Sequence, residues 1–317
     1  MVQNTSNTTA FIEAQQYSNF ILENLPDVLL PVGMSRDVSD FGSGTTLNIK
    51  SVGSATIQDV TEGVPMTFNA IDTGTVNLSI STYEGDAWAV NDELRQDSAQ
   101  LEQLMAMRGM EAARAIGESH ETAFLKACND AQTNAAANNV NSFAHRLVSA
   151  ETNNVIALSH FIDMKLAFDK ANVSQAGRIA IVDPVVEATL NGMTNLVNVS
   201  NNPMFEGIVT TGFEQNHKFI RNIFGWDIYT SNLLNKPVTM GDGTTTIASS
   251  GGVANVFMNI ADDNARPMMT AWRKRPSVEG WRDPEAREDK FQTTGRYGIG
   301  AQRLDTLAIL GTSNSSY

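Results

Sequence analysis

The chain has 317 residues, of which 42% are hydrophobic and 18% charged, proportions that are ordinary for a folded protein and exclude wholesale disorder. Its formal net charge of -13 argues against a protein whose main task is to coat nucleic acid. Cys128 is the single cysteine, which excludes an intrachain disulfide and a cysteine metal cage, and no apolar run approaches the length of a membrane span.

The N-terminal segment begins with a polar, uncharged stretch, residues 1–9, that lacks the basic and apolar regions of a signal peptide. We therefore expect a soluble protein made in a reducing cytoplasm. The apolar spacing of residues 11–25 predicts a short amphipathic helix that ends at Pro26, and residues 29–32 then predict an extended arm. Such an arm either packs on its own core or docks on a neighbouring subunit, and the sequence does not decide between the two.

Residues 44–81 change to alternation with a period of two, which predicts a long hairpin whose polar tip carries Asp59 and Glu62. An arm of roughly 19 residues would reach about 60 Å. A two-stranded ribbon of that length is marginal in water and leaves backbone groups unpaired along its edges. We therefore expect a neighbouring copy to supply a surface for it. The alternative is a pair of strands within a wider sheet of the same chain.

Residues 98–132 predict one long helix. Asn91 is predicted to cap a turn just before it, and Asp97 with Gln100 offers a second start that resembles a capping box. The helix would be roughly 50 Å long, about three times the usual length, and would serve as a beam to which other parts attach. Cys128 lies next to its apolar face and is expected to be a small core residue. The expected apolar face consists of Leu101, Leu104, Met105, Ala112, Ala115, Ile116, Ala123, Phe124 and Ala127.

An α/β module follows the long helix. Residues 159–171 predict a second helix, and residues 178–182 predict a buried strand. Asp183 is then a helix cap and Pro184 is a favoured first helical residue, so a strand, a turn and a helix follow in succession. Another strand is expected at residues 225–230.

The C-terminal third is predicted to be rich in strands. Residues 241–244 form a turn and residues 253–260 form a strand. Two long strands are expected at residues 268–274 and 290–310. The segment between them is expected to be a charged loop that passes through Pro276, Gly280 and Pro284.

Charge is distributed unevenly along the chain. Residues 1–90 carry ten acidic residues against Arg36 and Lys50, whereas residues 266–303 carry nine of the 22 basic residues. Opposite charges of this kind attract between copies and set register more than affinity. The hypothesis is an intersubunit contact that involves Asp59, Glu62, Arg273, Lys274, Arg275, Arg282 and Arg287. The alternative is a solvated face, whose isolated ion pairs contribute about 0–1 kcal/mol each.

Motifs of catalysis and metal binding are fragmentary. His120 and Glu121 begin a zinc-protease pattern, but Phe124 stands where the second histidine must be. No phosphate-binding Gly-Lys-Ser/Thr occurs in the sequence. The glycines of residues 295–300 suit bends or bulges better than a phosphate cradle. We therefore expect neither enzymatic activity nor a cofactor or metal.

The order of these elements along the chain resembles that of a known protein family. An arm, a long hairpin, a long helix, an α/β module and a final pair of long strands follow one another along nearly the whole chain. Local matches are residues 90–94 before the helix, 178–184, 225–231 and 295–310. In this order the chain resembles the major capsid protein of tailed bacteriophages with the HK97 fold.

The resemblance implies an α+β, HK97-like fold with a specific division of the chain. The implied parts are an N-terminal arm at residues 1–40, an extended E-loop hairpin at 41–82, a peripheral domain with the long spine helix at 83–150, an α/β axial domain at 151–265, peripheral-domain strands with the basic loop at 266–300, and a final axial-domain strand and tail at 301–317.

The implied function is self-assembly into hexamers and pentamers of an icosahedral shell that encloses double-stranded DNA in the virion. Synthesis and assembly would take place in the bacterial host cytoplasm. The implied partners are other copies of the chain, a portal protein, a scaffolding protein, a decoration protein in some relatives, and DNA that is held weakly and without sequence specificity. A scaffolding protein is implied as a separate chain because the short start leaves no room for a built-in one.

Neither a membrane nor a cofactor is implied. The hairpin carries only Lys50, away from its tip, so the covalent cross-link of some relatives is not expected. The alternatives are an encapsulin-like compartment shell, a phage tube protein, or an acidic α/β enzyme that uses the turn at Asp183.

Overall fold

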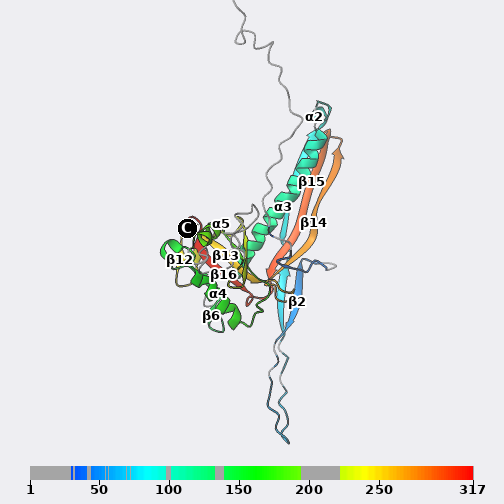
Figure 1. The fold of residues 1–317 in the computed structure, drawn as a ribbon. Helices are drawn as coiled ribbons and strands as arrows, with labels where there is room; N and C mark the ends of the chain where they lie inside the picture. The colour runs from blue at the N-terminus through cyan, green and yellow to red at the C-terminus, as the bar shows by residue number, and fades with distance from the viewer. Residues whose placement is uncertain are drawn as a thin grey trace, which may run out of the picture.

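The structure is a computed structural model that describes residues 30, 33–40, 44–53, 55, 57–68, 70–71, 73–97, 101–132, 139–193 and 222–316. The chain forms a rounded body and an elongated body, which are spanned by one long helix, and a hairpin that projects from the base of the elongated body (Figure 1). The helix predicted for residues 11–25, most of the predicted arm, and Gln100, the second residue of the alternative cap that starts at Asp97, lie outside the described residues.

The rounded body is built on a six-stranded sheet in the order β7-β16-β13-β8-β10-β9. Its central strands are buried along their whole length, as expected for a sheet that is covered on both faces. The strands predicted near residues 178, 225 and 253 are all confirmed. The strand bounds are Arg146–Val148 for β7, Leu307–Ser313 for β16, Gly252–Asn259 for β13, Arg178–Val182 for β8, Trp226–Thr230 for β10 and Asn222–Ile223 for β9.

Two helices cover one face of this sheet. They are α4 (Leu158–Lys170) and α5 (Pro184–Gly192), and their apolar side chains pack against alternate sheet residues such as Ala180 and Phe257. Asp183 accepts a hydrogen bond from the backbone N–H of Val185 at 3.1 Å, which confirms the predicted cap.

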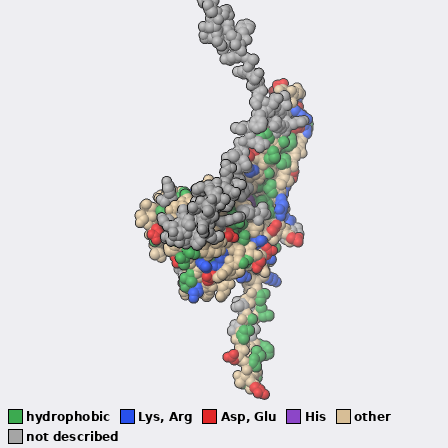
Figure 2. Space-filling view, viewed as in Figure 1, with side chains coloured by type: hydrophobic (Ala, Val, Ile, Leu, Met, Phe, Trp, Pro, Cys, Tyr) green, Lys and Arg blue, Asp and Glu red, His purple; other side chains and the backbone are tan. Residues whose placement is uncertain are grey.

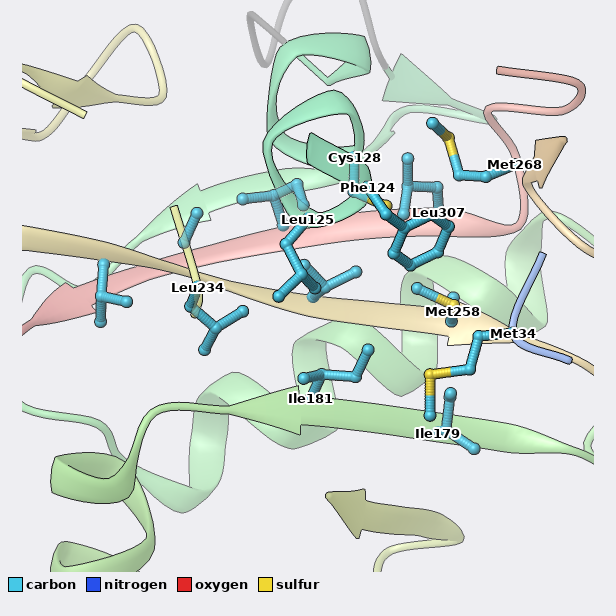
Figure 3. Close-up of a cluster of buried hydrophobic side chains, with 14 of the residues drawn as sticks. Met34, Phe124, Leu125, Cys128, Ile179, Ile181, Leu234, Met258, Met268 and Leu307 are labelled. Atoms are coloured by element: carbon cyan, nitrogen blue, oxygen red, sulfur yellow. The ribbon is translucent and has the colours of Figure 1, made fainter. Parts of the chain in front are cut away.

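The opposite face of the sheet is covered by the C-terminal end of the long helix. Phe124, Leu125 and Cys128 belong to the same apolar cluster as Ile179 and Ile181, which alternate with the residues that face α4 (Figure 3). The two faces of one strand therefore belong to two separate apolar clusters. The burial of Cys128 confirms its predicted place in the core.

The long helix α3 spans Leu101–Ala131 and follows a short helix α2, Asp92–Asp97. Asn91 caps α2 by accepting a hydrogen bond from the N–H of Leu94 at 3.0 Å, as predicted. The predicted apolar face is only partly right. Leu104 is 48% exposed and Ala115 is also exposed, because the N-terminal half of α3 rests on a narrow sheet. Leu125 was missing from that face and is fully buried, because the rounded body encloses the other end of the helix.

The elongated body contains a four-stranded sheet in the order β1-β14-β15-β4. The expectation of a charged loop through Pro276 and Gly280 is wrong, because β14 continues through both and only residues 284–287 form the turn. Register shifts around residues 272–277 accommodate the proline in the strand. The strand bounds are Arg36–Asp37 for β1, Met268–Asp283 for β14, Glu288–Ala301 for β15 and Thr82–Asn91 for β4.

The single strand predicted for residues 290–310 is also wrong. It divides into β15, in the four-stranded sheet, and β16, in the six-stranded sheet. The N–H groups of Gln302 and Arg303 donate to the carbonyl of Pro267, at 2.7 and 3.1 Å, and turn the chain out of the first sheet. The last strand thereby completes a different layer from the strand before it.

The predicted hairpin is confirmed, but its paired strands are shorter than predicted. Strands β2 (Thr46–Val52) and β3 (Thr73–Ser79) form a two-stranded antiparallel sheet of their own, not part of a wider one. Within the described residues the ladder covers seven residues on each side, far short of the whole arm. The remaining strand pairs are small. They are β5 (Asn139–Val140) with β6 (Phe143–Ala144), and β11 (Met240–Gly241) with β12 (Thr246–Ile247), the second of which encloses the turn predicted at residues 241–244.

Candidate intersubunit surfaces

The distal part of the hairpin exposes large apolar side chains to solvent. Phe68 is 98% exposed, Ile57 89% and Ile71 79%. Figure 2 shows hydrophobic side chains along this projection and acidic ones near its end. A contiguous exposed apolar surface on a soluble protein marks an interaction site.

The hairpin tip is closed by side chains and a turn. The N–H of Val64 donates to the carbonyl of Thr61 at 3.1 Å, with Gly63 at a φ of 80°. The side-chain amide of Gln58 then bonds both backbone groups of Thr67, at 2.7 and 3.1 Å. This amide takes the place of one ladder step, and no other backbone pairing joins the arms between β2–β3 and the turn in the described part of the hairpin. The tip therefore has an ordered shape while most of its backbone groups are available.

The acidic residues predicted at an interface lie at this tip. Asp59 and Glu62 are both exposed, and neither forms an ion pair among the described residues. The predicted basic residues lie on β14 and its following turn, in the elongated body on the other side of the hairpin base (Figure 1). One chain therefore does not bring the two predicted sets together.

Several of the predicted basic residues pair inside the chain instead. Lys274 lies 2.6 Å from Glu279, and Arg275 lies 3.0 Å from Asp37. These pairs are solvent-exposed, so each contributes about 0–1 kcal/mol and leaves the cation accessible to a second partner.

The far end of the elongated body carries the strongest of these contacts. Arg282 donates to both oxygens of Asp92, at 2.7 and 2.8 Å, and to Asp289 at 3.1 Å. The hydrogen bond from Arg282 lowers the pKa of Asp92, and the same contacts raise the pKa of Arg282. The carbonyl of Arg287 in the neighbouring turn accepts a bond from the N–H of Asp92 at 3.2 Å. The pairing of Arg282 with Asp92 could not be predicted from the sequence, because the two residues lie 190 positions apart.

An apolar groove lies between the N-terminal half of α3 and the four-stranded sheet, with a volume of about 530 Å³. Trp88 and Phe291 stack at its floor with ring centroids 5.9 Å apart, and Arg108 lies over the Trp88 ring at 5.8 Å. Small residues on α3, such as Gly109, keep the groove open. It is lined by Trp88, Met105, Ala106, Gly109, Met110, Ala113, Val278 and Phe291.

A second cavity, of about 340 Å³, lies where α3, β14 and the segment around Met34 meet. His120 lies at its side, with ring centroids 4.8 Å from Trp272 and 4.9 Å from Tyr297. Burial lowers the pKa of His120, and the nearby charge of Glu84 opposes that effect. The imidazole therefore belongs to an aromatic cluster at the junction.

Glu121, the other half of the zinc-like fragment, is buried and fully engaged. Its carboxylate accepts bonds from the N–H of Leu30 and the hydroxyl of Ser231, both at 2.8 Å. Among the described residues no group of three His, Cys, Asp or Glu side chains is arranged to hold a metal ion. The carboxylate instead joins α3 to two distant segments of the chain.

The glycines of β15 allow a close approach of the hairpin base. A Cβ at Gly298 would overlap the backbone of Ser79 and Ile80, and one at Gly300 would lie 2.8 Å from Leu78. Leu78 and Ile80 are buried against Met269 and Ala271. These glycines thus fix where the hairpin leaves the elongated body.

Two further expectations concern the surface of the chain. Lys50 is exposed on β2, away from the hairpin tip. In the described part of the chain, none of the helices has both the length and the apolar character that crossing a lipid bilayer requires.

The comparisons with known proteins bear on these surfaces. A family model described as "Phage capsid protein" matches residues 72–310. The capsid structure of Cyanophage P-SCSP1u is similar over 96% of this chain and 94% of that chain, with a TM-score of 0.71 and 14% identity. No curated protein matches the sequence.

Two more solved structures have the same fold. The mature capsid of bacteriophage PhiM1 matches over 94% of this chain and 91% of that chain, with a TM-score of 0.69 and 14% identity. A structure from Mycobacterium phage Che8 matches over 94% and 97%, with a TM-score of 0.66 and 16% identity. At these identities the likeness establishes a shared HK97-like fold.

Proposed function

From its membership of the phage capsid protein family, we propose that copies of this chain assemble into hexamers and pentamers of an icosahedral capsid around double-stranded DNA. The chain is a structural protein of the virion shell. The observation that carries the proposal is the projecting hairpin, whose apolar side chains meet no partner in the described part of their own chain. Burial of one exposed side chain the size of Phe68 contributes about 1.5–3 kcal/mol. In a closed shell, each chain has neighbouring copies whose surfaces can bury these apolar side chains.

The domains are proposed to follow the two sheets. The four-stranded sheet with α3 is the peripheral domain, the six-stranded sheet with α4 and α5 is the axial domain, and β2–β3 is the E-loop. Because β7 pairs with β16 in the six-stranded sheet, we move the end of the first peripheral segment from residue 150 to just before Arg146.

The further partners are a scaffolding protein, a portal protein, a decoration protein and weakly held DNA. The net charge of -13 supports weak contact with DNA, because a wall of that charge binds few phosphates. Synthesis and assembly are proposed to occur in the bacterial host cytoplasm. The role is structural and not enzymatic, which the family membership supports.

Electron microscopy of the chain, purified or co-expressed with its scaffolding protein, tests the proposal. Closed icosahedral shells are the expected result. Open tubes would favour a tube protein, and a stable monomer whose hairpin folds back on its own surface would contradict the proposal. Shells that enclose protein cargo but never DNA would favour the encapsulin-like alternative.

A further inference from the structure

The cavity of about 340 Å³ between α3, β14 and the segment before β1 has an unbalanced charge. Two of the side chains that line it, Asp37 and Glu121, are acidic, and one, Arg275, is basic. His120 is the remaining titratable side chain of the lining, and burial lowers its pKa, which favours the neutral ring. The cavity is therefore lined by one more negative charge than positive charges.

Glu121 is the carboxylate that lacks a cation. Arg275 donates to Asp37 at 3.0 Å, and both of those side chains are more than half exposed. Glu121 is only 7% exposed, and in the described part of the chain no basic side chain lies within 4.0 Å of its carboxylate. Arg36 is the first basic residue of the sequence, and its guanidinium donates to Asn264 at 3.3 Å instead. The segment that leads into the cavity thus brings no cation to Glu121.

The hydrogen bonds that Glu121 accepts come from neutral donors. One oxygen accepts from the backbone N–H of Leu30 and the other from the hydroxyl of Ser231, each at 2.8 Å. A buried carboxylate is costly unless a cation or enough donors balance its charge. Because a carboxylate has about four acceptor positions, each oxygen keeps one position for a further donor.

A second acceptor belongs to the same lining. The Nε2 atom of His120 is buried and has no hydrogen-bond partner in the described structure. Such an atom is uncommon in a folded protein and points to a partner that is not part of the chain. In a neutral ring with its proton on Nδ1, Nε2 accepts a hydrogen bond. The cavity therefore offers a charged acceptor and a neutral one, and it lacks a donor for both.

The other walls of the cavity suit an organic cation. Trp272 lines the cavity and stacks on His120, with ring centroids 4.8 Å apart, and the face of an indole ring attracts a cation. Leu30, Met34 and Phe124 add apolar surface to the lining. No group of three metal-ligating side chains is found among the described residues. These surfaces fit a charged head with a short hydrocarbon chain.

We propose that this cavity binds a primary ammonium group on a short aliphatic chain, which donates to the carboxylate of Glu121 and to Nε2 of His120 while its chain lies against Phe124. A primary ammonium has three N–H donors and no acceptor, which matches the two open acceptors of the lining. Two sources carry this group, a free aliphatic amine and the side chain of a lysine from another chain. The chemistry of recognition is the same for both.

A ligand in this cavity joins separate parts of the subunit. The lining comes from the segment before β1, from α3 and from β14. A ligand that binds only the folded chain stabilises it in proportion to its saturation. The proposal concerns the single subunit, so its failure leaves the proposed shell function untouched, and a failure to form shells leaves the cavity untouched.

Titration of the dissociated, full-length subunit with n-butylammonium chloride tests the proposal by calorimetry. n-Butanol has a similar shape without the charge, and butyrate carries the opposite charge. n-Butylammonium should bind at least about tenfold more tightly than either, because a charge-assisted hydrogen bond to a buried carboxylate is the stronger kind. It should also raise the unfolding temperature of the subunit. Equal binding of the three probes, or no binding of n-butylammonium, overturns the proposal without any variant.

Variants then assign the binding to the cavity. Glu121→Gln removes the charge at nearly constant size and should weaken n-butylammonium binding about tenfold or more, whereas His120→Phe removes only a neutral acceptor and should weaken it about fivefold. Glu93→Gln removes the same charge from an exposed position on α2 and should change nothing. Circular dichroism checks that each variant is folded. Equal affinities of Glu121→Gln and Glu93→Gln overturn the assignment to this cavity.

Assembled shells distinguish the two sources of the ammonium group. If the natural ligand is a free amine, n-butylammonium should bind to shells as it binds to subunits. If a lysine of another chain fills the cavity, n-butylammonium should bind to subunits and be excluded from shells. Both results support the ammonium site, and binding to neither form overturns it.

Discussion

The guanidinium of Arg146 on β7 donates through Nε to the carbonyl of Gly241 on β11, at 2.6 Å. The Nη1 group of the same side chain donates to the carbonyl of Asn129, in the last turn of α3, and to the carbonyl of Gln132, which directly follows α3. These bonds tie the end of the long helix to the six-stranded sheet. The carbonyl of Asn129 also accepts a bond from the N–H of Gln132 at 3.3 Å. A cation at a helix C-terminus is favourable because the last carbonyls of the helix lack the full set of backbone donors. The residue is only 4% exposed. The joint between the two bodies is therefore polar and specific as well as apolar.

Replacing Arg146→Met should lower the free energy of unfolding by about 3 kcal/mol, because several buried carbonyls lose their donor. Thermal or urea denaturation of the dissociated subunit measures the change. Arg95→Met is the matched control, since the pair of Arg95 with Asp289 is exposed and contributes about 0–1 kcal/mol. Equal effects of the two substitutions would contradict a special role for Arg146.

Replacing glycine by alanine should have opposite effects on stability at the hairpin base and in the groove beside α3. Gly298→Ala should detach the hairpin base and destabilise the subunit, because its Cβ overlaps the backbone of Ser79. Gly109→Ala should stabilise α3 by about 1 kcal/mol, because the added methyl meets only Val278 at 3.8 Å. Denaturation of both variants checks the opposite signs. Protease cleavage within residues 57–68 should remain unchanged in Gly109→Ala.

The sequence predicted those elements whose signals are local. The continuous apolar run of β8 lies directly before Asp183, the cap of α5, and the cap at Asn91 lies directly before α2. The length of α3 followed from the helical spacing of its apolar residues. In each of these cases the residues that decide the structure are neighbours in sequence.

The errors came from contacts distant in sequence. Pro276 lies in a strand because the register shifts around it absorb the missing N–H group, and no local pattern reveals such shifts. The ion pair between Arg282 and Asp92 joins residues 190 positions apart. The basic cluster was visible in the sequence, but its partners within the chain were not.

Stability should fall as the pH is lowered from about 6.5, the ordinary histidine value. Burial lowers the pKa of His120, His145 and His160, so the unfolded chain binds protons in this range that the folded chain does not. Stability therefore rises with pH across the range. The lowered pKa of Asp92 acts in a separate window below its ordinary value of 3.8. Unfolding measured between pH 7 and 5 tests the sign.

Replacing His120 measures how much of this pH dependence of stability comes from one side chain. His120→Phe keeps an aromatic ring against Trp272 and Tyr297 but has no proton to bind. Its stability should depend less steeply on pH than that of the unsubstituted chain. An unchanged slope would exclude His120 as a contributor.

Phe68→Ser should leave the isolated subunit as stable as before and reduce shell formation. The side chain is 98% exposed, so its removal costs the monomer nothing in packing. Its burial between copies is worth about 1.5–3 kcal/mol per contact. Val238→Ser, at an exposed position of the rounded body, is the control and should assemble normally. Light scattering and electron microscopy measure assembly, and a normal yield from Phe68→Ser would refute the hairpin contact.

Charge reversal on β14 should impair shell formation while the subunit stays folded. The variant is Arg273→Glu, Lys274→Glu and Arg275→Glu, tested by electron microscopy for shells and by circular dichroism for folding. The ion pairs that Lys274 and Arg275 make with Glu279 and Asp37 are exposed, so their loss costs the subunit about 0–1 kcal/mol each. The loss between copies is larger, because attraction becomes repulsion in every contact of the shell.

A second, compensating charge reversal distinguishes an electrostatic contact between copies from general damage to the subunit. Asp59→Lys and Glu62→Lys, combined with the triple reversal, restore opposite charges at the contact and should recover shells that neither set alone produces. These two tip residues form no ion pair among the described residues, so their reversal does not disturb the subunit. Normal shells from the triple variant would defeat the hypothesis at once. Failure of the combined variant would show that the basic residues act in some way other than attraction to the tip, since the charge product is the same as in the original pair.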